Sequence, residues 1–151
     1  MTGYDLDGTI CSKMSYNISY FKANRAERRA IDVIKEIHYR AAKLILTPLE
    51  KEYVIITSRK PKHSTITFKW LKKATLEPKE IYFMGLSRTR NNMIEYKSNK
   101  INELGLKKYY EDDSKIARAL RKKCPSTEVI EVEPIIEIYL VKNFINDCLQ
   151  F

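Results

Sequence analysis

The sequence lacks several features that would assign it to a simple class of protein. None of its apolar runs approaches the roughly 20 residues that a membrane-spanning helix needs, although hydrophobic residues make up 44% of the 151 positions. The first residues lack the basic and apolar regions of a secretory signal, and we see no internal repeat, linker or low-complexity segment. We therefore expect a single domain, residues 1–151, in the cytoplasm and without a membrane partner.

Cysteine and histidine are also scarce. Cys11, Cys124 and Cys148 are odd in number, widely separated and without the spacing of metal ligands. Of the two histidines, His38 falls inside a predicted helix, where a structural role is expected, and His63 falls in a predicted exposed loop. A reduced, cytoplasmic protein is the economical interpretation of this cysteine content.

Positive charge, in contrast, is abundant. The 28 Lys and Arg residues exceed the 19 Asp and Glu residues and give a formal net charge of +9. Such an excess suits an anionic partner, but a solvated basic surface that aids solubility explains it equally well. Charge alone does not separate a nucleic-acid partner from a small phosphorylated substrate.

Short apolar segments alternate with helical ones along the chain. Residues 1–8 read as a short, weak strand, and the continuous β-branched run at 53–56 suits a strand that is buried on both faces. Further strands are predicted at residues 80–84, 108–111 and 127–132.

Helices are predicted between these strands. From Asn24 to Ile45 apolar residues recur with a helical period, Asn24 and Glu27 have the spacing of a capping box, and Pro48 marks the end. Shorter helices are predicted at residues 64–74, at 98–104 with Gly105 closing the helix, and at 114–123 with Ser114 as the cap.

This alternation predicts an α/β fold, a Rossmann-like three-layer α/β/α sandwich with a central, mainly parallel five-stranded sheet. Residues 10–22 show no clear period and read as a loop or a small flap. The tail at 134–151 is apolar enough to pack on the domain. The span from Thr9 to Thr57 holds a helix and at most a small flap, and no large insert is needed between Thr57 and Lys97, so we expect a minimal cap and an open site.

The segment Asp5-Leu6-Asp7-Gly8-Thr9 carries the first chemical signal. Two carboxylates this close repel each other and need a cation, a shared proton or separate roles. Gly8 allows a tight turn and a close approach to a substrate, although Asp-Gly is also an ordinary turn signal. Because ligands of parallel sheets bind beyond the carboxyl ends of the strands, Asp5, Thr57 and Glu111-Asp112-Asp113 are all expected at one edge.

Taken in order, the first segment, Thr57-Ser58-Arg59, Lys97 and Glu111-Asp112-Asp113 resemble the four motifs of the haloacid dehalogenase (HAD) superfamily over roughly residues 1–132. The resemblance implies a Mg²⁺-dependent phosphatase. In this interpretation Asp5 attacks phosphorus and forms an aspartyl-phosphate, and Asp7 protonates the leaving oxygen and then helps to deprotonate water.

The resemblance also implies the remaining roles. Thr57, Ser58, Arg59 and Lys97 would bind the phosphoryl group, with Lys97 neutralising charge on it and on Asp5. Lys100 competes with Lys97 for that role, but the position of Lys97 seven residues before Leu104-Gly105 favours it.

A magnesium ion would be held by the Asp5 carboxylate, the Asp7 backbone carbonyl and an acid of the fourth motif. Asp112 is the first choice for that acid. Asp113 is expected to act near the ion through a water molecule, or to be the ligand instead of Asp112. Glu111 is the outside choice.

Basic residues surround the predicted site, at Arg59, Lys60, Lys62, Arg88 and Arg90. An open site with phosphate-attracting loops favours nucleotides or phosphorylated nucleic-acid ends, and Thr57-Ser58-Arg59 is similar to the nucleotidase-like and polynucleotide-phosphatase-like branches of the family.

Three questions stay open at this stage. One alternative function is a nucleic-acid-binding module on an HAD-like scaffold with weak or lost catalysis. Phosphoryl transfer to an acceptor other than water would use the same residues. The sequence does not determine the oligomeric state.

Overall fold

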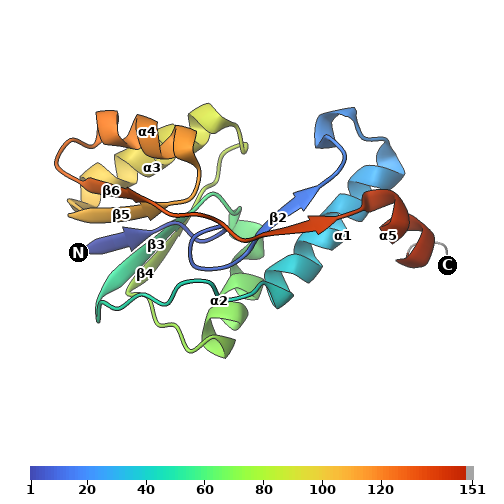
Figure 1. The fold of residues 1–151 in the computed structure, drawn as a ribbon, viewed down its shortest axis with the longest axis horizontal. Helices are drawn as coiled ribbons and strands as arrows, with labels where there is room; N and C mark the ends of the chain where they lie inside the picture. Colours follow the sequence, from blue (N-terminus) through green and yellow to red (C-terminus); the bar gives the residue numbers. More distant parts are fainter. Residues whose placement is uncertain (149–151) are drawn as a thin grey trace.

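A computed structural model describes the chain from residue 1 to residue 148, and its centre is a five-stranded sheet in which all neighbouring strands are parallel (Figure 1). The strand order is β4-β3-β1-β5-β6. The strands are β1 (Thr2–Tyr4), β3 (Tyr53–Thr57), β4 (Glu80–Phe83), β5 (Lys108–Glu111) and β6 (Glu128–Glu131). All five lie where the sequence predicts them.

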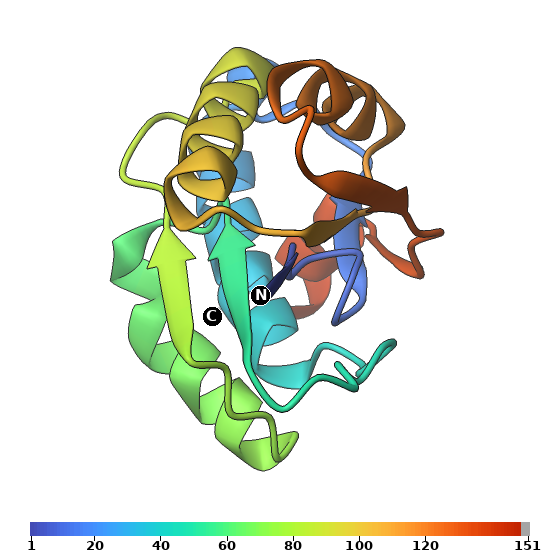
Figure 2. The same ribbon diagram turned by 90° about the vertical axis from the view of Figure 1, so that its left-hand side faces the viewer.

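Helices cover both faces of this sheet and make three layers (Figure 2). They are α2 (Ser64–Lys73) on one face and α3 (Arg90–Leu104) with α4 (Ser114–Lys123) on the other. Along β3, Tyr53 and Ile55 join the apolar cluster beside α2, whereas Val54 and Ile56 join the cluster beside α3 and α4. The predicted three-layer α/β/α architecture is therefore confirmed.

The central strand β1 is as short as its sequence indicates. Gly3 lies between β3 and β5, and a Cβ atom there would come within 2.5 Å of Leu106 and 3.0 Å of Tyr109. The glycine therefore lets the side chains of Leu106 and Tyr109 pack directly on the strand. Asp5 continues the ladder by one hydrogen bond, from its N–H to the Tyr110 carbonyl at 2.9 Å.

The remaining elements form a second lobe beside the carboxyl ends of these strands (Figure 1). Strand β2 (Lys13–Tyr16) pairs in parallel with β7 (Ile136–Tyr139), and both lie against α1 (Arg25–Ala41) and α5 (Val141–Cys148). Two short 3-10 helices, η1 (Tyr20–Lys22) and η2 (Pro61–His63), complete the described elements. The sequence predicts neither β2 nor β7, and residues 149–151 of the predicted tail lie outside the described residues.

Several predicted helix ends are wrong. Helix α1 has the expected capping box between Asn24 and Glu27 but ends at Ala41, before Pro48, because the chain then becomes extended. Helix α3 begins at Arg90 instead of residue 98, so Lys97 lies within the helix and does not open it.

Two caps also need comment. Gly105 ends α3 in the left-handed conformation, as predicted, with φ of 60°. The cap of α4 is Asp113, not Ser114, and its carboxylate accepts hydrogen bonds from the N–H groups of Lys115 and Ile116. Across residues 1–148, none of the helices combines the length and the apolar character needed to cross a membrane.

Candidate active site

Three carboxylates meet at the carboxyl edge of the sheet. Asp5 follows β1, while Glu111 ends the neighbouring strand β5 and Asp112 follows it. One carboxylate oxygen from each lies within 4.8 Å of the other two, and all three residues are buried. We call Asp5, Glu111 and Asp112 the carboxylate cluster. It includes Glu111, the outside choice in the sequence analysis.

Lys97 lies between two members of this cluster. Its Nζ is 3.1 Å from Asp5 Oδ1 and 2.7 Å from Glu111 Oε2, and only 2% of its side chain is exposed. Lys100, the competing residue, pairs instead with Glu103 on the surface at 3.0 Å and stands over the Tyr82 ring. The geometry thus brings Lys97 to Asp5 and leaves Lys100 on the outer side of α3.

A second lysine, which the sequence analysis missed, reaches the cluster from the second lobe. Lys13 begins β2 and its Nζ is 2.8 Å from Asp112 Oδ2, with 38% of the lysine side chain exposed. Lys13 therefore stands between the cluster and solvent. The sequence signal for it was weak, because its strand is short and mixes polar and apolar residues.

Gly8 is required where the first motif passes this cluster. Its φ is +89°, and an added Cβ would lie 2.4 Å from Asp112 Oδ2. A side chain at position 8 would therefore strain the backbone and push Asp112 away from Asp5.

The charges in this site perturb one another. Burial raises the pKa of Asp5 well above its ordinary range, Glu111 raises it further, and Lys97 opposes both effects. Burial also raises the pKa of Glu111 against the charge of Lys97. Because only two lysines face three acids, ionisation of all three acids would leave an excess of negative charge; a bound cation would relieve it and favour the ionised form of Asp5.

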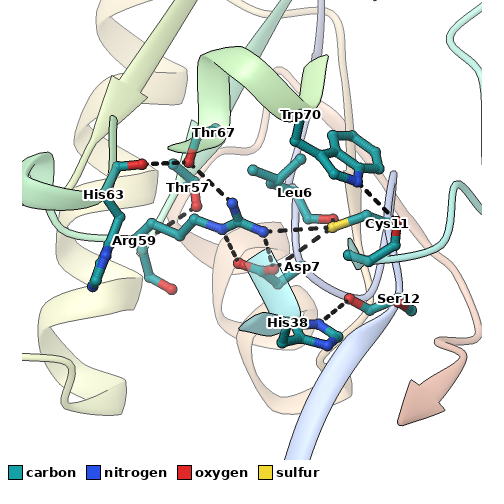
Figure 3. A network of polar contacts seen from close by, with 12 residues as sticks. Leu6, Asp7, Cys11, Ser12, His38, Thr57, Arg59, His63, Thr67 and Trp70 are labelled. Carbon is teal, nitrogen blue, oxygen red and sulfur yellow. Dashed lines mark hydrogen bonds and ion pairs between the residues drawn. The ribbon is translucent and has the colours of Figure 1, made fainter. Parts of the chain in front are cut away.

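Asp7 lies close by but faces a different partner (Figure 3). The Arg59 guanidinium donates two hydrogen bonds to the Asp7 carboxylate, from Nη2 to Oδ1 at 2.7 Å and from Nε to Oδ2 at 2.8 Å. Burial raises the pKa of Asp7, but the charge and hydrogen bonds of Arg59 outweigh it and lower the pKa to about 2. Asp7 is therefore ionised in this arrangement.

Arg59 itself is fully buried. Its Nη1 donates to Thr67 Oγ1 at 3.0 Å, and its Cζ lies 3.8 Å from the centre of the Tyr39 ring on α1. The guanidinium thus joins the end of β3 to α1 and α2. Its predicted contact with substrate stays a prediction, because here its donors serve Asp7 and Thr67.

The other residues of the second motif are also buried. Thr57 ends β3 on the opposite side of β1 from Glu111, and its Oγ1 accepts a hydrogen bond from the Arg59 N–H at 3.1 Å. Its hydroxyl proton is not used in that bond. Ser58 Oγ accepts from Arg88 Nη2 at 3.2 Å, which brings the loop before α3 to the site. Asp113, capping α4, is outside the carboxylate cluster.

His38 of α1 contacts residues of the second lobe (Figure 3). Its Nε2 lies 3.0 Å from the Ser12 carbonyl and its Nδ1 lies 3.2 Å from the Tyr139 hydroxyl. Ser12 Oγ in turn donates to Glu137 at 2.6 Å. This histidine is buried, and it joins α1 to β7 and to the residue before β2.

Cys11 and two aromatic residues of α2 have mostly structural surroundings. Burial raises the pKa of the Cys11 thiol, so it stays protonated at neutral pH. Trp70 packs in the core, whereas Phe68 is 54% exposed. A surface hollow of about 630 Å³ between the end of α2 and the start of β4 lies at the amino edge of the sheet, away from the carboxylates.

The carboxylate cluster could hold a metal ion. All its donor atoms are carboxylate oxygens, which Mg²⁺ prefers, and they converge from two neighbouring strands. Asp5 and Asp112 were both predicted as ligands. Glu111 joins them in the structure, while the Asp7 carboxylate is held by Arg59.

Comparison with known proteins adds information on the fold. No protein-family model and no curated protein matches the chain. A chain in the structure of the Pnkp1/Rnl/Hen1 RNA repair complex is similar, with a TM-score of 0.54 and 11% sequence identity. The match covers 89% of this chain and 42% of that chain, so this chain spans less than half the length of its neighbour. At this identity the likeness shows a common fold.

Proposed function

We propose that this protein is a Mg²⁺-dependent phosphomonoesterase of the HAD type that acts through an aspartyl-phosphate. One observation carries the proposal: Asp5, Glu111 and Asp112 converge at the carboxyl edge of a parallel sheet, with Lys97 paired to Asp5. These residues come from three of the four segments whose order resembles the family. The three acids and the lysine lie where α/β proteins bind their ligands, and this position supports phosphoryl chemistry over a purely structural role.

The ion would be held by Asp5 and Asp112, with Glu111 beside them and the Asp7 backbone carbonyl as the further predicted ligand. When bound, Mg²⁺ would neutralise charge on the phosphoryl group and orient it. Lys13 Nζ lies 2.8 Å from an Asp112 oxygen. For that oxygen to hold an ion, Lys13 would have to release it, and its charge would then be available to the substrate phosphate.

The chain's own residues then account for the two chemical steps. An Asp5 oxygen forms a bond to phosphorus while the bond to the leaving oxygen breaks, and that oxygen takes a proton from Asp7. Water next attacks the aspartyl-phosphate, gives its proton to Asp7 and releases inorganic phosphate and free Asp5. Lys97 lowers the repulsion between the anionic Asp5 and the anionic phosphate.

Asp7 needs a change in its surroundings to act as an acid. With two hydrogen bonds from Arg59 its pKa is about 2, and it carries no proton at neutral pH. A substrate phosphate that draws Arg59 away would raise the pKa of Asp7. Arg59 would thereby come to bind substrate, as the resemblance implies.

Nucleotides or phosphorylated nucleic-acid ends are the substrates that we propose. The basic loops of the chain favour phosphate-rich ligands, and the structural neighbour belongs to an RNA repair complex. Hydrolysis and transfer to another acceptor use the same residues, so the acceptor must be measured.

Release of phosphate from an aryl phosphate tests the proposal. With Mg²⁺ the wild-type protein should hydrolyse the ester, and Asp5→Asn should lower kcat by at least about 10³-fold because it removes the nucleophile. Glu52→Gln, which neutralises an exposed acid beside the start of β3, is the matched control and should keep full activity. An inactive wild type, or an active and folded Asp5→Asn variant, would refute the proposal.

A second candidate function is a nucleic-acid-binding module without efficient catalysis. The carboxylate cluster is buried from solvent, and Asp7 is ionised and has no proton to give to a leaving group. Both features favour a module without efficient catalysis. It predicts salt-sensitive binding of RNA or DNA by both the wild type and Asp5→Asn, with no phosphate released by either. The absence of binding at low salt would remove this candidate.

A further inference from the structure

Positive side chains from three separate elements lie near one another and near the Asp7–Arg59 pair. Lys35 comes from α1, Lys60 and Lys62 come from the segment around η2, and Arg88 comes from the loop before α3. We call these four residues the basic rim. Arg88 is tied to the site by its hydrogen bond to Ser58 Oγ at 3.2 Å.

Packing between α1 and η2 brings the lysines of the rim together. One turn after Lys35, the ring of Tyr39 lies 5.1 Å from the ring of His63 and 3.8 Å from Arg59 Cζ. His63 directly follows Lys62. Burial lowers the pKa of Lys35, and the positive charges of Arg88, Lys62 and Lys60 lower it further against the opposing charge of Asp32.

Within the described part of the chain, no carboxylate pairs with any member of the rim. Elsewhere on the surface, Lys100, Lys108 and Lys123 each lie within 4.0 Å of a glutamate, whereas Lys72 and Lys107, like the rim, are in none of these ion pairs. The rim is therefore distinguished by its position, because its cations come from three elements and act on one another, and Arg88 acts on Asp7.

The charged surface continues along α1 into the second lobe. Arg28 and Lys35 are seven residues apart on one helix face, about 10 Å along the axis. Both cations lie near the Tyr20 ring, with Arg28 Cζ 5.3 Å and Lys35 Nζ 5.6 Å from its centre. Tyr20 is partly exposed, so a single aromatic ring with two neighbouring cations is open to solvent in the second lobe.

We propose that the basic rim, together with Tyr20 and Arg28, binds the sugar–phosphate backbone of a single-stranded nucleic acid whose phosphorylated end enters the site. Cations that follow a backbone and an aromatic ring on which a base can stack are the means by which proteins hold single strands. A mononucleotide would contact only the part nearest Asp7. The position of the strand's end rests on the proposed function; the backbone contacts do not.

The inference is tested by fluorescence anisotropy with labelled octanucleotides, oligo(U) and oligo(dT), each carrying a 3′- or a 5′-phosphate. The Asp5→Asn protein is used with Mg²⁺, so that no turnover occurs. We expect the octanucleotides to bind at least about tenfold tighter than a nucleoside monophosphate, because several phosphates are neutralised at once.

Two charge-matched pairs of substitutions locate the binding surface. Lys35→Gln with Lys62→Gln should weaken octanucleotide binding about tenfold at low salt and lower the slope of log Kd against log salt by about 2. Lys72→Gln with Lys107→Gln removes the same charge from exposed positions outside the rim and should change Kd less than twofold. If the first pair disturbs folding, Lys60→Gln with Lys62→Gln replaces it, since both side chains are exposed.

Tyr20→Leu should weaken octanucleotide binding about tenfold as well, through lost stacking, with the salt slope unchanged. Equal effects of the rim pair and the control pair would overturn the inference, as would octanucleotides that bind no tighter than the monophosphate. Failure of the proposed function is distinguishable: the wild type would then bind octanucleotides at the rim but release no phosphate from them or from an aryl phosphate.

Discussion

The two lobes of the molecule bury different numbers of apolar side chains. In the first lobe, formed by the five-stranded sheet with α2, α3 and α4, Ile55 and Ile56 of β3 are fully buried in clusters on opposite faces. The core of the second lobe has few buried side chains, two of them alanines: Ala23, Ala30, Ile31, Ile34 and Val141. Its other apolar residues are only partly buried.

Polar contacts add to this small core. Glu137 of β7 accepts from Ser12 Oγ, and His38 of α1 contacts the Ser12 carbonyl and the Tyr139 hydroxyl. The second lobe in turn carries Lys13 to Asp112. The larger core thus holds the carboxylates, and we expect the lobe with the smaller core, which supplies Lys13, to open more readily.

The largest expected effect separates the cores of the two lobes. Ile55→Ala should lower the free energy of unfolding by roughly 3–5 kcal/mol, because β3 cannot collapse around the cavity. Ile34→Ala should cost roughly 2–3 kcal/mol and act mainly on the second lobe. Amide hydrogen exchange measures this: Ile34→Ala should speed exchange in β2 and β7 more than in β3.

The exposed Ile138→Ala on β7, 71% exposed, is the control and should change neither lobe by more than about 0.5 kcal/mol. If Ile34→Ala speeds exchange equally in β3 and β7, the two lobes form one cooperative unit and the distinction between them is wrong.

A smaller effect concerns the Asp7–Arg59 pair at the junction of the lobes. The pKa of Asp7 falls from 3.8 to about 2 on folding, so the folded state favours the ionised form. Ionised Asp7 therefore contributes about 2 kcal/mol to the free energy of unfolding. This contribution is fully present above pH 4 and is lost as the pH falls toward 2. Urea unfolding between pH 6 and pH 2 should show it.

The Asp7→Asn variant checks the origin of this acid sensitivity. It should be less stable at pH 6, because Arg59 is left buried without its partner, but it should lose less stability than the wild type between pH 4 and pH 2. A parallel loss in both proteins would show that other groups cause it.

Much of the first lobe, and the start of α1, could be predicted from the sequence. The β-branched run at 53–56, the capping box at Asn24 and the turn at Gly105 are local signals, and local energies decide those elements. The convergence of Asp5 with Asp112 followed from the rule that parallel strands carry their ligands at one edge.

The rest depends on contacts between distant parts of the chain. Strands β2 and β7 are short, half-exposed and joined across more than 100 residues, so neither shows a period of its own. The first half of α3, which begins Arg90-Asn91-Asn92, likewise lacks a clear apolar stripe. The bidentate Asp7–Arg59 pair and the choice of Glu111 over Asp113 are tertiary outcomes that no local pattern reveals.

Binding of Mn²⁺, a paramagnetic substitute for Mg²⁺ at carboxylate sites, tests the central claim most directly. Electron paramagnetic resonance should detect one bound ion per chain, and Asp112→Asn should weaken its binding at least about tenfold, whereas Lys100→Gln should not. A protein that binds no Mn²⁺, or binds it equally well after Asp112→Asn, would contradict the account of Asp5, Glu111 and Asp112 as one cation site.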